Sequence, residues 1–180
     1  MEDTLIIKSH YFNQELFEPL YQLLKNITFP LRDAKRNNSR HGFPKHRCLT
    51  FGIVKRRFKG IITNSVSNAK YPNVYNELLN LATQLNPDFK FNSIHINHNL
   101  VCPKHKDRKN IGNSMIVSIG DYTGCKLVVN DEICDTHYSP VIFNGSLLEH
   151  YNTDDLVGNK YSIVYYNSLG NNRIIEKDLL

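Results

Sequence analysis

The sequence contains no long apolar run. None of its 180 residues belongs to an apolar stretch near the roughly 18 residues that a membrane-spanning helix requires. The N-terminus also lacks the charged and then apolar pattern of a secretory signal, and internal repeats and low-complexity tracts are missing. We therefore expect a soluble intracellular protein, cytoplasmic or nuclear, with no signal peptide and no membrane partner. A single domain is expected over residues 1–180, because one core remains efficient up to roughly 250 residues.

Closely spaced cysteines are missing as well. The four cysteines are far apart and form no CxxC pair (Cys48, Cys102, Cys125 and Cys134). Neither a disulfide framework nor a structural zinc site is expected from this spacing. Reduced thiols in an intracellular compartment are the simpler interpretation.

Positive charge is concentrated in one segment. The chain carries a net charge of +5, and residues 32–59 hold ten Lys or Arg against one acid, Asp33. That segment has a net charge of +9, which leaves −4 for the remainder. Clustered cations favour a polyanionic partner, because they neutralise phosphates and release counterions. A solvated basic loop is the alternative.

The first half of the chain is expected to contain two helices and two strands. Apolar residues at helical spacing cover residues 13–25, where Pro19 should bend or shorten the helix. A second helix should follow Pro72 and end at Asn86. Strands are expected over residues 4–8 and 48–54, and the aperiodic residues 32–47 should form a loop.

From residue 89 onward, the pattern changes to strands. They are expected over residues 91–99, 114–119, 125–130, 141–143 and 161–167. Helices first and strands later indicate an α+β fold in which the helices buttress a sheet or barrel. Within the domain, we divide the chain into a helical, lid and basic region over residues 1–90 and a strand-rich core over residues 91–167.

A His-x-Asp triplet follows the first of these later strands. On an extended segment, His105 and Asp107 point to the same side and can bind one cation together. The preceding strand carries polar residues on one face, so it should line a wet pocket (Ser93, His95, Asn97 and Asn99). His95 and His98 lie on opposite faces of that strand and cannot both join one metal. Neither is expected to be a ligand.

A later histidine would complete a site of two histidines and one carboxylate. That set leaves coordination positions open and is typical of non-haem Fe(II) oxygenases. The candidates are His137, in a segment expected to cross the surface, and His150, which follows a strand and turn. We favour His150, because a cation that opens a strand follows it ten residues later.

That cation is Lys160, and Ser162 follows it on the same face of a strand. The cosubstrate 2-oxoglutarate chelates iron at one end and leaves a distal carboxylate that needs a cation and hydroxyl donors. Lys160 and Ser162 can supply both. A surface lysine at a strand start is the alternative.

Several short motifs surround these residues. They are Asn97-His98-Asn99, His105-Lys106-Asp107, Gly120-Asp121-Tyr122-Thr123-Gly124, Asn144-Gly145, and Gly158-Asn159-Lys160-Tyr161-Ser162. Together they resemble the Fe(II)/2-oxoglutarate dioxygenases of the TET/J-binding-protein group and, more distantly, AlkB-type enzymes. The resemblance covers most of the chain and is strongest over residues 91–167.

The resemblance implies a double-stranded β-helix, the jelly-roll or cupin-like core, in which His105, Asp107 and His150 bind Fe(II). It places Asn97 near 2-oxoglutarate, with Lys160 and Ser162 at the distal carboxylate. It also implies that O₂ is used to oxidise a methyl group on a nucleic-acid pyrimidine, with release of succinate and CO₂.

Two positions depart from the pattern of that group. Lys160 stands where the group commonly has Arg, and Cys125 stands where it has a second Gly. A lysine can still pair with a carboxylate but loses the bidentate fork of an arginine. Prolyl-hydroxylase-type enzymes also use Lys at this spacing, so the departure weakens the inference about the substrate more than that about the cosubstrate.

The expected partner is nucleic acid, with DNA favoured over RNA. Arg40, Lys45 and Arg47 are the expected phosphate contacts, and a duplex base would have to be flipped out to reach iron. One alternative is the same oxygenase acting on a protein side chain or a small molecule. Another is a cupin-like module that binds nucleic acid without catalysis.

Overall fold

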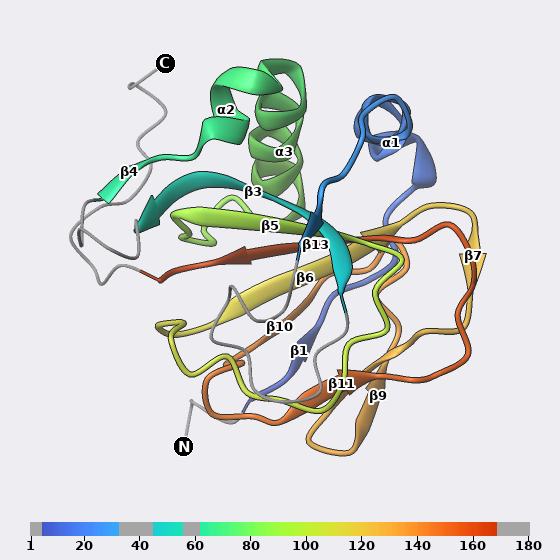
Figure 1. Cartoon of the computed structure of the whole chain (residues 1–180). Coiled ribbons are helices and arrows are strands. Elements are labelled where there is room, and N and C mark those ends of the chain that lie inside the picture. The colour runs from blue at the N-terminus through green and yellow to red at the C-terminus, as the bar shows by residue number, and fades with distance from the viewer. Residues whose placement is uncertain (1–4, 33–44, 56–61, 169–180) are drawn as a thin grey trace.

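A large antiparallel sheet forms the centre of the computed structural model, which describes residues 5–32, 45–55 and 62–168 (Figure 1). The strands follow one another in the order β1-β10-β6-β13-β5-β3-β2, and β4 pairs with the C-terminal end of β3 outside this order. Their bounds are β1 Ile7–Lys8, β2 Leu31–Arg32, β3 His46–Lys55, β4 Ile62–Asn64, β5 Ser93–His98, β6 Ser114–Ile119, β10 Val141–Phe143 and β13 Tyr161–Tyr166.

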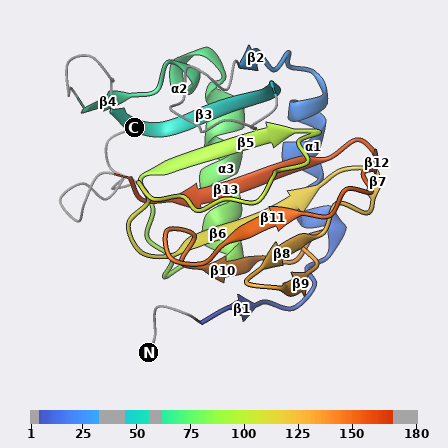
Figure 2. The same ribbon diagram turned by 60° about the horizontal axis from the view of Figure 1, so that its bottom comes forward.

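Two smaller sheets accompany the large one. The first has the order β11-β8-β9, and the second pairs β12 with β7. Their bounds are β7 Tyr122–Thr123, β8 Leu127–Val129, β9 Glu132–Cys134, β11 His150–Asn152 and β12 Val157–Gly158. Figure 2 shows β11, β8 and β9 in front of the large sheet and the helices α1 and α3 behind it. This is the arrangement of a double-stranded β-helix buttressed by helices, so the expected fold is confirmed.

The helices cover the outer face of the large sheet. They are α1 (Glu18–Lys25), α2 (Val66–Lys70) and α3 (Pro72–Leu85), and a short 3₁₀ turn, Gln14–Leu16, precedes α1. Pro19 lies in the first turn of α1, where its missing N–H costs no hydrogen bond. The helix is therefore shortened as expected, and it begins at Glu18.

Side chains alternate between the two faces of the large sheet and make two separate cores. Leu49, Ile96, Ile163 and Val117 face the helices and pack in one cluster with Leu78. The second cluster lies between the inner face and the β11-β8-β9 sheet. It contains Ile116, Leu127, Val129, Cys134, Val141, Phe143 and Leu148.

The strand β3 differs from its expected form. It begins at His46, two residues early, because Leu31 and Arg32 of β2 pair with Arg47 and His46. The loop expected over residues 32–47 is therefore wrong at its C-terminal end, and residues 33–44 lie outside the described part. The strands β1, β2, β3 and β4, all from the first ninety residues, thus belong to the same sheet as the later strands.

Most other expected strands agree with the structure to within a few residues. The strand expected over residues 4–8 is β1, although residues 1–4 lie outside the described ranges. The strand expected over residues 125–130 is shorter, because Cys125 and Asn130 have positive φ values of 51° and 47°. In the described part of the chain, no helix is long and apolar enough to cross a membrane.

Candidate metal centre and cosubstrate pocket

The structure brings His105, Asp107 and His150 together. One ligand atom from each lies within 4.8 Å of the others. Nε2 of His105 is 3.5 Å from Oδ1 of Asp107, and Nε2 of His150 is 3.6 Å from Oδ2 of the same carboxylate. Three ligand atoms therefore surround one point, as the sequence predicted.

Backbone pairing holds the three residues in place. His105 and His150 form an antiparallel bridge, with N–H···O distances of 3.0 and 2.9 Å, which attaches the triplet to the small sheet. The Asp107 N–H donates to the Gly145 carbonyl at 2.7 Å. A Cβ at Gly145 would lie 3.3 Å from Cε1 of His150, so a glycine lets this turn approach the site closely.

Both imidazoles are oriented by backbone carbonyls. Nδ1 of His105 lies 2.7 Å from the Pro103 carbonyl, and Nδ1 of His150 lies 3.0 Å from the Leu148 carbonyl. A carbonyl can only accept, so each Nδ1 carries the proton and each Nε2 can present its lone pair to a metal. Such hydrogen bonds are usual behind metal-binding histidines. The donor set therefore fits a divalent metal such as Fe(II).

The site is closed on the histidine side and open at the carboxylate. The side chains of His105 and His150 are 14% and 5% exposed, whereas that of Asp107 is 37% exposed. Burial alone would raise the pKa of Asp107, but hydrogen bonds from the two histidines outweigh it and lower that pKa. Burial lowers the pKa of His105, but hydrogen bonds with Asp107 and Cys102 outweigh it and raise the value to about 10. The metal-free site therefore favours an imidazolium beside a carboxylate.

Lys160 is a buried cation. Its side chain lies directly before β13, and the residue is only 2% exposed. Nζ donates to the Cys125 carbonyl at 2.5 Å and lies 5.2 Å from the centre of the Tyr122 ring. Burial lowers the pKa of Lys160 below its ordinary value. The alternative of a surface lysine is therefore wrong.

Glycines allow the close contacts that bury Lys160. Gly120 has a φ of 122°, and a Cβ there would lie only 2.1 Å from the Asn159 carbonyl oxygen. No L side chain fits such a position. The segment that ends in Lys160 can therefore lie directly against the segment from Gly120 to Cys125.

A row of polar residues crosses the inner face of the sheet beside Lys160. Asn97 pairs with Ser162, and Ser162 pairs with Ser118 on the next strand. Oδ1 of Asn97 is buried and has no hydrogen-bond partner among the described residues. The two ends of an amide can exchange by a flip, so Asn97 can offer either a donor or an acceptor to a bound molecule. Ser118, which bonds to Thr136 at 2.9 Å, was not anticipated, because only the pairing of β6 with β13 brings it here.

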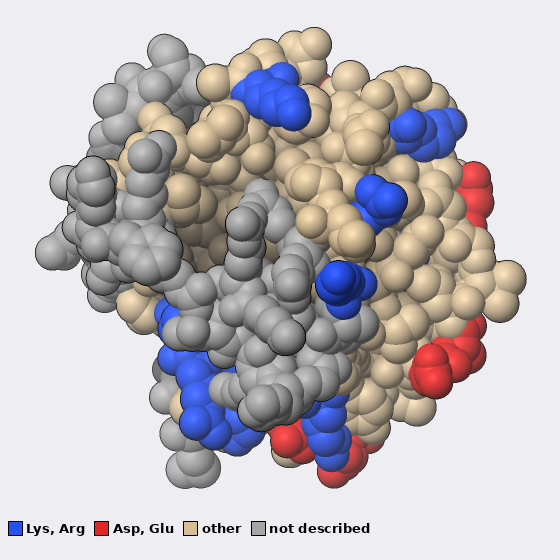
Figure 3. Space-filling model, viewed as in Figure 1, with Lys and Arg blue, Asp and Glu red and all other residues tan. Residues whose placement is uncertain are grey.

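Two of the three expected phosphate contacts lie in the described part of the chain. Lys45 is exposed directly before β3. Arg47 shares the outer face with Leu49, and its Nη1 donates to the Phe29 carbonyl at 2.8 Å. Arg40 lies outside the described residues. Figure 3 shows Lys and Arg side chains in separate groups over one face, and Asp and Glu toward its right and lower edges.

The remaining histidines lie elsewhere. Nε2 of His137 lies 3.0 Å from the Gly120 carbonyl, and burial lowers the pKa of this half-buried residue. The sequence suggested that His137 lies in a segment crossing the surface, but the residue is partly buried. It does not join the metal site. His98 stacks on Tyr161, while His95 lies on the inner face beside Thr50, so the two point to opposite faces as expected.

Comparison with known proteins supports the fold. No protein-family model matches the chain, and no curated protein matches it in sequence. The solved structure of NgTET1 in complex with 5mC DNA aligns with a TM-score of 0.60 at 12% identity, over 92% of this chain and 72% of that one. A 2OG-Fe(II) oxygenase family oxidoreductase from Burkholderia pseudomallei aligns at 0.57 and 12% identity, over 96% and 89%.

Two further structures are similar. OsALKBH1 aligns with a TM-score of 0.52 at 10% identity, over 91% of this chain and 97% of that one. A Pseudomonas putida prolyl-4-hydroxylase aligns at 0.51 and 10% identity, over 94% and 95%. The resemblance seen in the sequence is thus confirmed at the level of the fold. These proteins differ in what they act on, so the comparison leaves several substrate classes open.

Proposed function

We propose that this protein is an Fe(II)- and 2-oxoglutarate-dependent dioxygenase. The observation that carries the proposal is the convergence of His105, Asp107 and His150, with both Nε2 atoms oriented by backbone carbonyls. Two imidazoles and one carboxylate bind iron and leave positions for a cosubstrate and O₂. The fold shared with a 2OG-Fe(II) oxygenase supports this reading.

Different residues of the chain would bind the iron and the cosubstrate. His105, Asp107 and His150 would hold the iron, and Lys160 would pair with the distal carboxylate of 2-oxoglutarate. Ser162 and Asn97 would supply further hydrogen bonds to it from the same inner face. When bound, iron, 2-oxoglutarate and O₂ supply the oxidising power to hydroxylate a C–H bond, with release of succinate and CO₂. The exposed edge of Asp107 marks the side from which a substrate can approach.

We further propose that the substrate is a methyl group on a nucleic-acid base, in DNA rather than RNA. The net charge of +9 over residues 32–59 supports this, as does the shared fold with NgTET1, which was solved with 5mC DNA. In the described part of this segment, Lys45 is the better candidate for a phosphate contact, because Arg47 already bonds to Phe29. The phosphate contact of Arg40, which lies outside the described residues, stays a prediction.

The test is to incubate the protein with Fe(II), 2-oxoglutarate, ascorbate and oligonucleotides that are unmodified or carry methylated bases. Succinate and the nucleosides are then measured by mass spectrometry. Base oxidation predicts an oxidised nucleoside and equivalent succinate, both absent from the Asp107→Ala variant. Substantial succinate without an oxidised nucleoside would contradict the substrate and leave the oxygenase intact.

The prolyl-4-hydroxylase of the same fold favours a second candidate, a hydroxylase of protein side chains or small molecules. Such an enzyme would turn over 2-oxoglutarate without nucleic acid and would show no steep loss of DNA binding with salt. A non-catalytic module that only binds nucleic acid would keep its affinity in the His105→Ala variant and never form succinate.

A further inference from the structure

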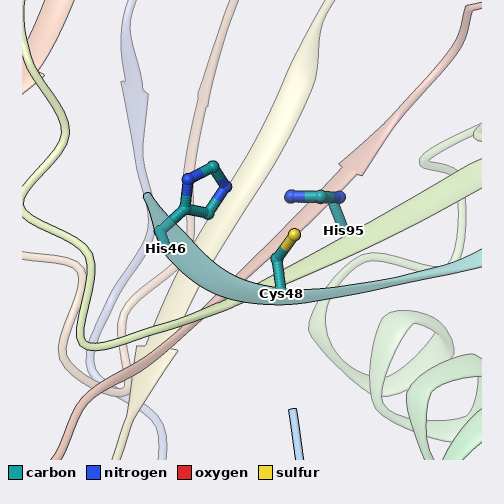
Figure 4. Close-up of side chains that lie close together, drawn as sticks. All are labelled: His46, Cys48 and His95. Carbon is teal, nitrogen blue, oxygen red and sulfur yellow. The ribbon is translucent and has the colours of Figure 1, made fainter. Parts of the chain in front are cut away.

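A second group of metal-ligating side chains lies on the inner face of the large sheet. His46, Cys48 and His95 each place one ligand atom within 4.8 Å of the other two. Figure 4 shows the Cys48 sulfur between the two imidazoles, with His46 and Cys48 projecting from β3 and His95 from β5. The group shares no residue with the site of His105, Asp107 and His150.

Strand geometry explains why the three side chains converge. His46 and Cys48 are two residues apart on β3, so they point to the same face. Cys48 pairs with Asn97 and Thr50 pairs with His95, so His95 lies diagonally across from Cys48 on the neighbouring strand. Diagonal neighbours in an antiparallel pair are within reach of long side chains. The sequence alone did not suggest this group, because His46 was expected in a loop and His95 was not expected to be a ligand.

We propose that His46, Cys48 and His95 bind Zn²⁺, with a water molecule or another external donor in the fourth position. A thiolate and two imidazoles form a nitrogen and sulfur set that suits zinc. Zinc–ligand bonds of about 2.0–2.3 Å place tetrahedral ligand atoms about 3.5 Å apart. Separations of up to 4.8 Å therefore need only small side-chain movements to close on an ion.

Burial and a supporting hydrogen bond favour the same conclusion. Cys48 is 2% exposed and His46 is 8% exposed, so both ligands from β3 are held in a packed environment. Nδ1 of His95 lies 2.9 Å from the Thr50 hydroxyl. When that Nδ1 donates, Nε2 presents its lone pair, and the ring is oriented as metal-binding histidines usually are. Zinc binding would release the thiol proton of Cys48.

The proposed ion would connect β3 to β5 beside Asn97. Cys48 is the strand partner of Asn97, which is proposed to contact the cosubstrate. The site does not rest on the proposed oxygenase function, because neither its residues nor its metal chemistry belongs to the iron site. A protein without oxygenase activity would still bind zinc here.

Titration of the untagged, metal-free full chain with Co(II) tests the proposal, because Co(II) replaces zinc and reports its ligands by absorption. The wild-type protein should show a thiolate-to-Co(II) charge-transfer band and intense tetrahedral bands, and Zn²⁺ should abolish them. Cys48→Ala should lose the charge-transfer band and bind half as much Co(II). His95→Gln should bind Co(II) at this site at least tenfold more weakly.

Control variants separate this site from other effects. Cys134→Ala removes another buried thiol, on β9, and should keep the full spectrum. Asp107→Ala should lose the weak absorption of the iron site while keeping the thiolate band. Circular dichroism and thermal melting show whether each variant folds, and His95→Gln keeps the test open if Cys48→Ala does not. The proposal is overturned if wild-type protein shows no thiolate band, or if the band persists in folded Cys48→Ala.

Discussion

At the scale of single residues, Lys160 is the least ordinary feature of the candidate site. An ammonium group is rarely buried without a charged partner, because removing it from water is costly. Here the described partners of Nζ are the Cys125 carbonyl, the Cys125 thiol and an aromatic ring, all of them neutral. Such a group gains most from a ligand that brings a carboxylate. The burial of Lys160 therefore supports its proposed pairing with the distal carboxylate of 2-oxoglutarate.

The Lys160→Met variant should separate ligand binding from stability. Methionine fills much of the same space without the buried charge, so we expect a melting temperature no lower than that of the wild type. The apparent affinity for 2-oxoglutarate should fall at least tenfold, because the pairing with its distal carboxylate is lost. Calorimetric titration and turnover at varied 2-oxoglutarate would measure this. An unchanged requirement for 2-oxoglutarate would assign the distal carboxylate to another residue.

Cys125 occupies a backbone conformation that suits glycine. Its φ is 51°, in the left-handed region, where a side chain costs about 1 kcal/mol. Cys125→Gly would relieve that cost and lose the packing of a buried thiol, so stability should change by less than about 1 kcal/mol. Cys125→Val should lose about 2 kcal/mol or more, because a branched side chain is strained there. Urea unfolding would compare the two, and equal losses would contradict the backbone explanation.

At the scale of elements, the strength of local patterns decided what could be predicted. Both long helices and the strands β6, β10 and β13 follow from periodicity, and His105 with Asp107 follows from strand alternation. The start of β3 could not be predicted, because it depends on pairing with β2, which is two residues long and has no pattern of its own. The polar row that includes Asn97 and the metal-ligating group that includes Cys48 depend on the order of the strands in the sheet. The periodicity of apolar residues along the chain does not reveal that order.

The role of Arg47 also could not be predicted from local sequence patterns. Charge alone suggested a phosphate contact, but its guanidinium donates to the Phe29 carbonyl and thereby ties the segment before β2 to β3. Arg47→Met should therefore cost about 1 kcal/mol of stability, the usual contribution of such a hydrogen bond. Lys45→Met, two residues earlier and exposed, should leave stability unchanged and weaken binding to DNA at low salt. Denaturant unfolding and fluorescence anisotropy would measure the two effects. Equal stability of the two variants would contradict the anchoring role.

At the scale of the whole molecule, the two faces of the large sheet differ in what they carry. Its outer face packs against α1 and α3 in the larger apolar cluster. Its inner face carries Asn97, Ser162 and the second metal-ligating group, and it faces the small sheet that supplies His150. Substitutions on the outer face should therefore act through unfolding. Those at the polar inner-face residues Asn97 and Ser162 should act through the proposed binding of 2-oxoglutarate, whereas those in the second apolar cluster on the same face should also act through unfolding.

The stability of the metal-free protein should depend on pH through the proposed iron site. The pKa of His105 is raised to about 10, so its proton stabilises the metal-free fold fully below the unfolded value of about 6.5. That stabilisation is lost as pH rises through 10, whereas a metal must displace the same proton and binds better over this range. The gain in melting temperature on adding Mn(II), which prefers oxygen and nitrogen ligands to thiolate, should therefore widen between pH 6.5 and 9. His105→Ala should abolish the gain, and His137→Gln, a histidine outside the site, should keep it. A gain that does not change with pH would show that His105 carries no proton in the metal-free protein.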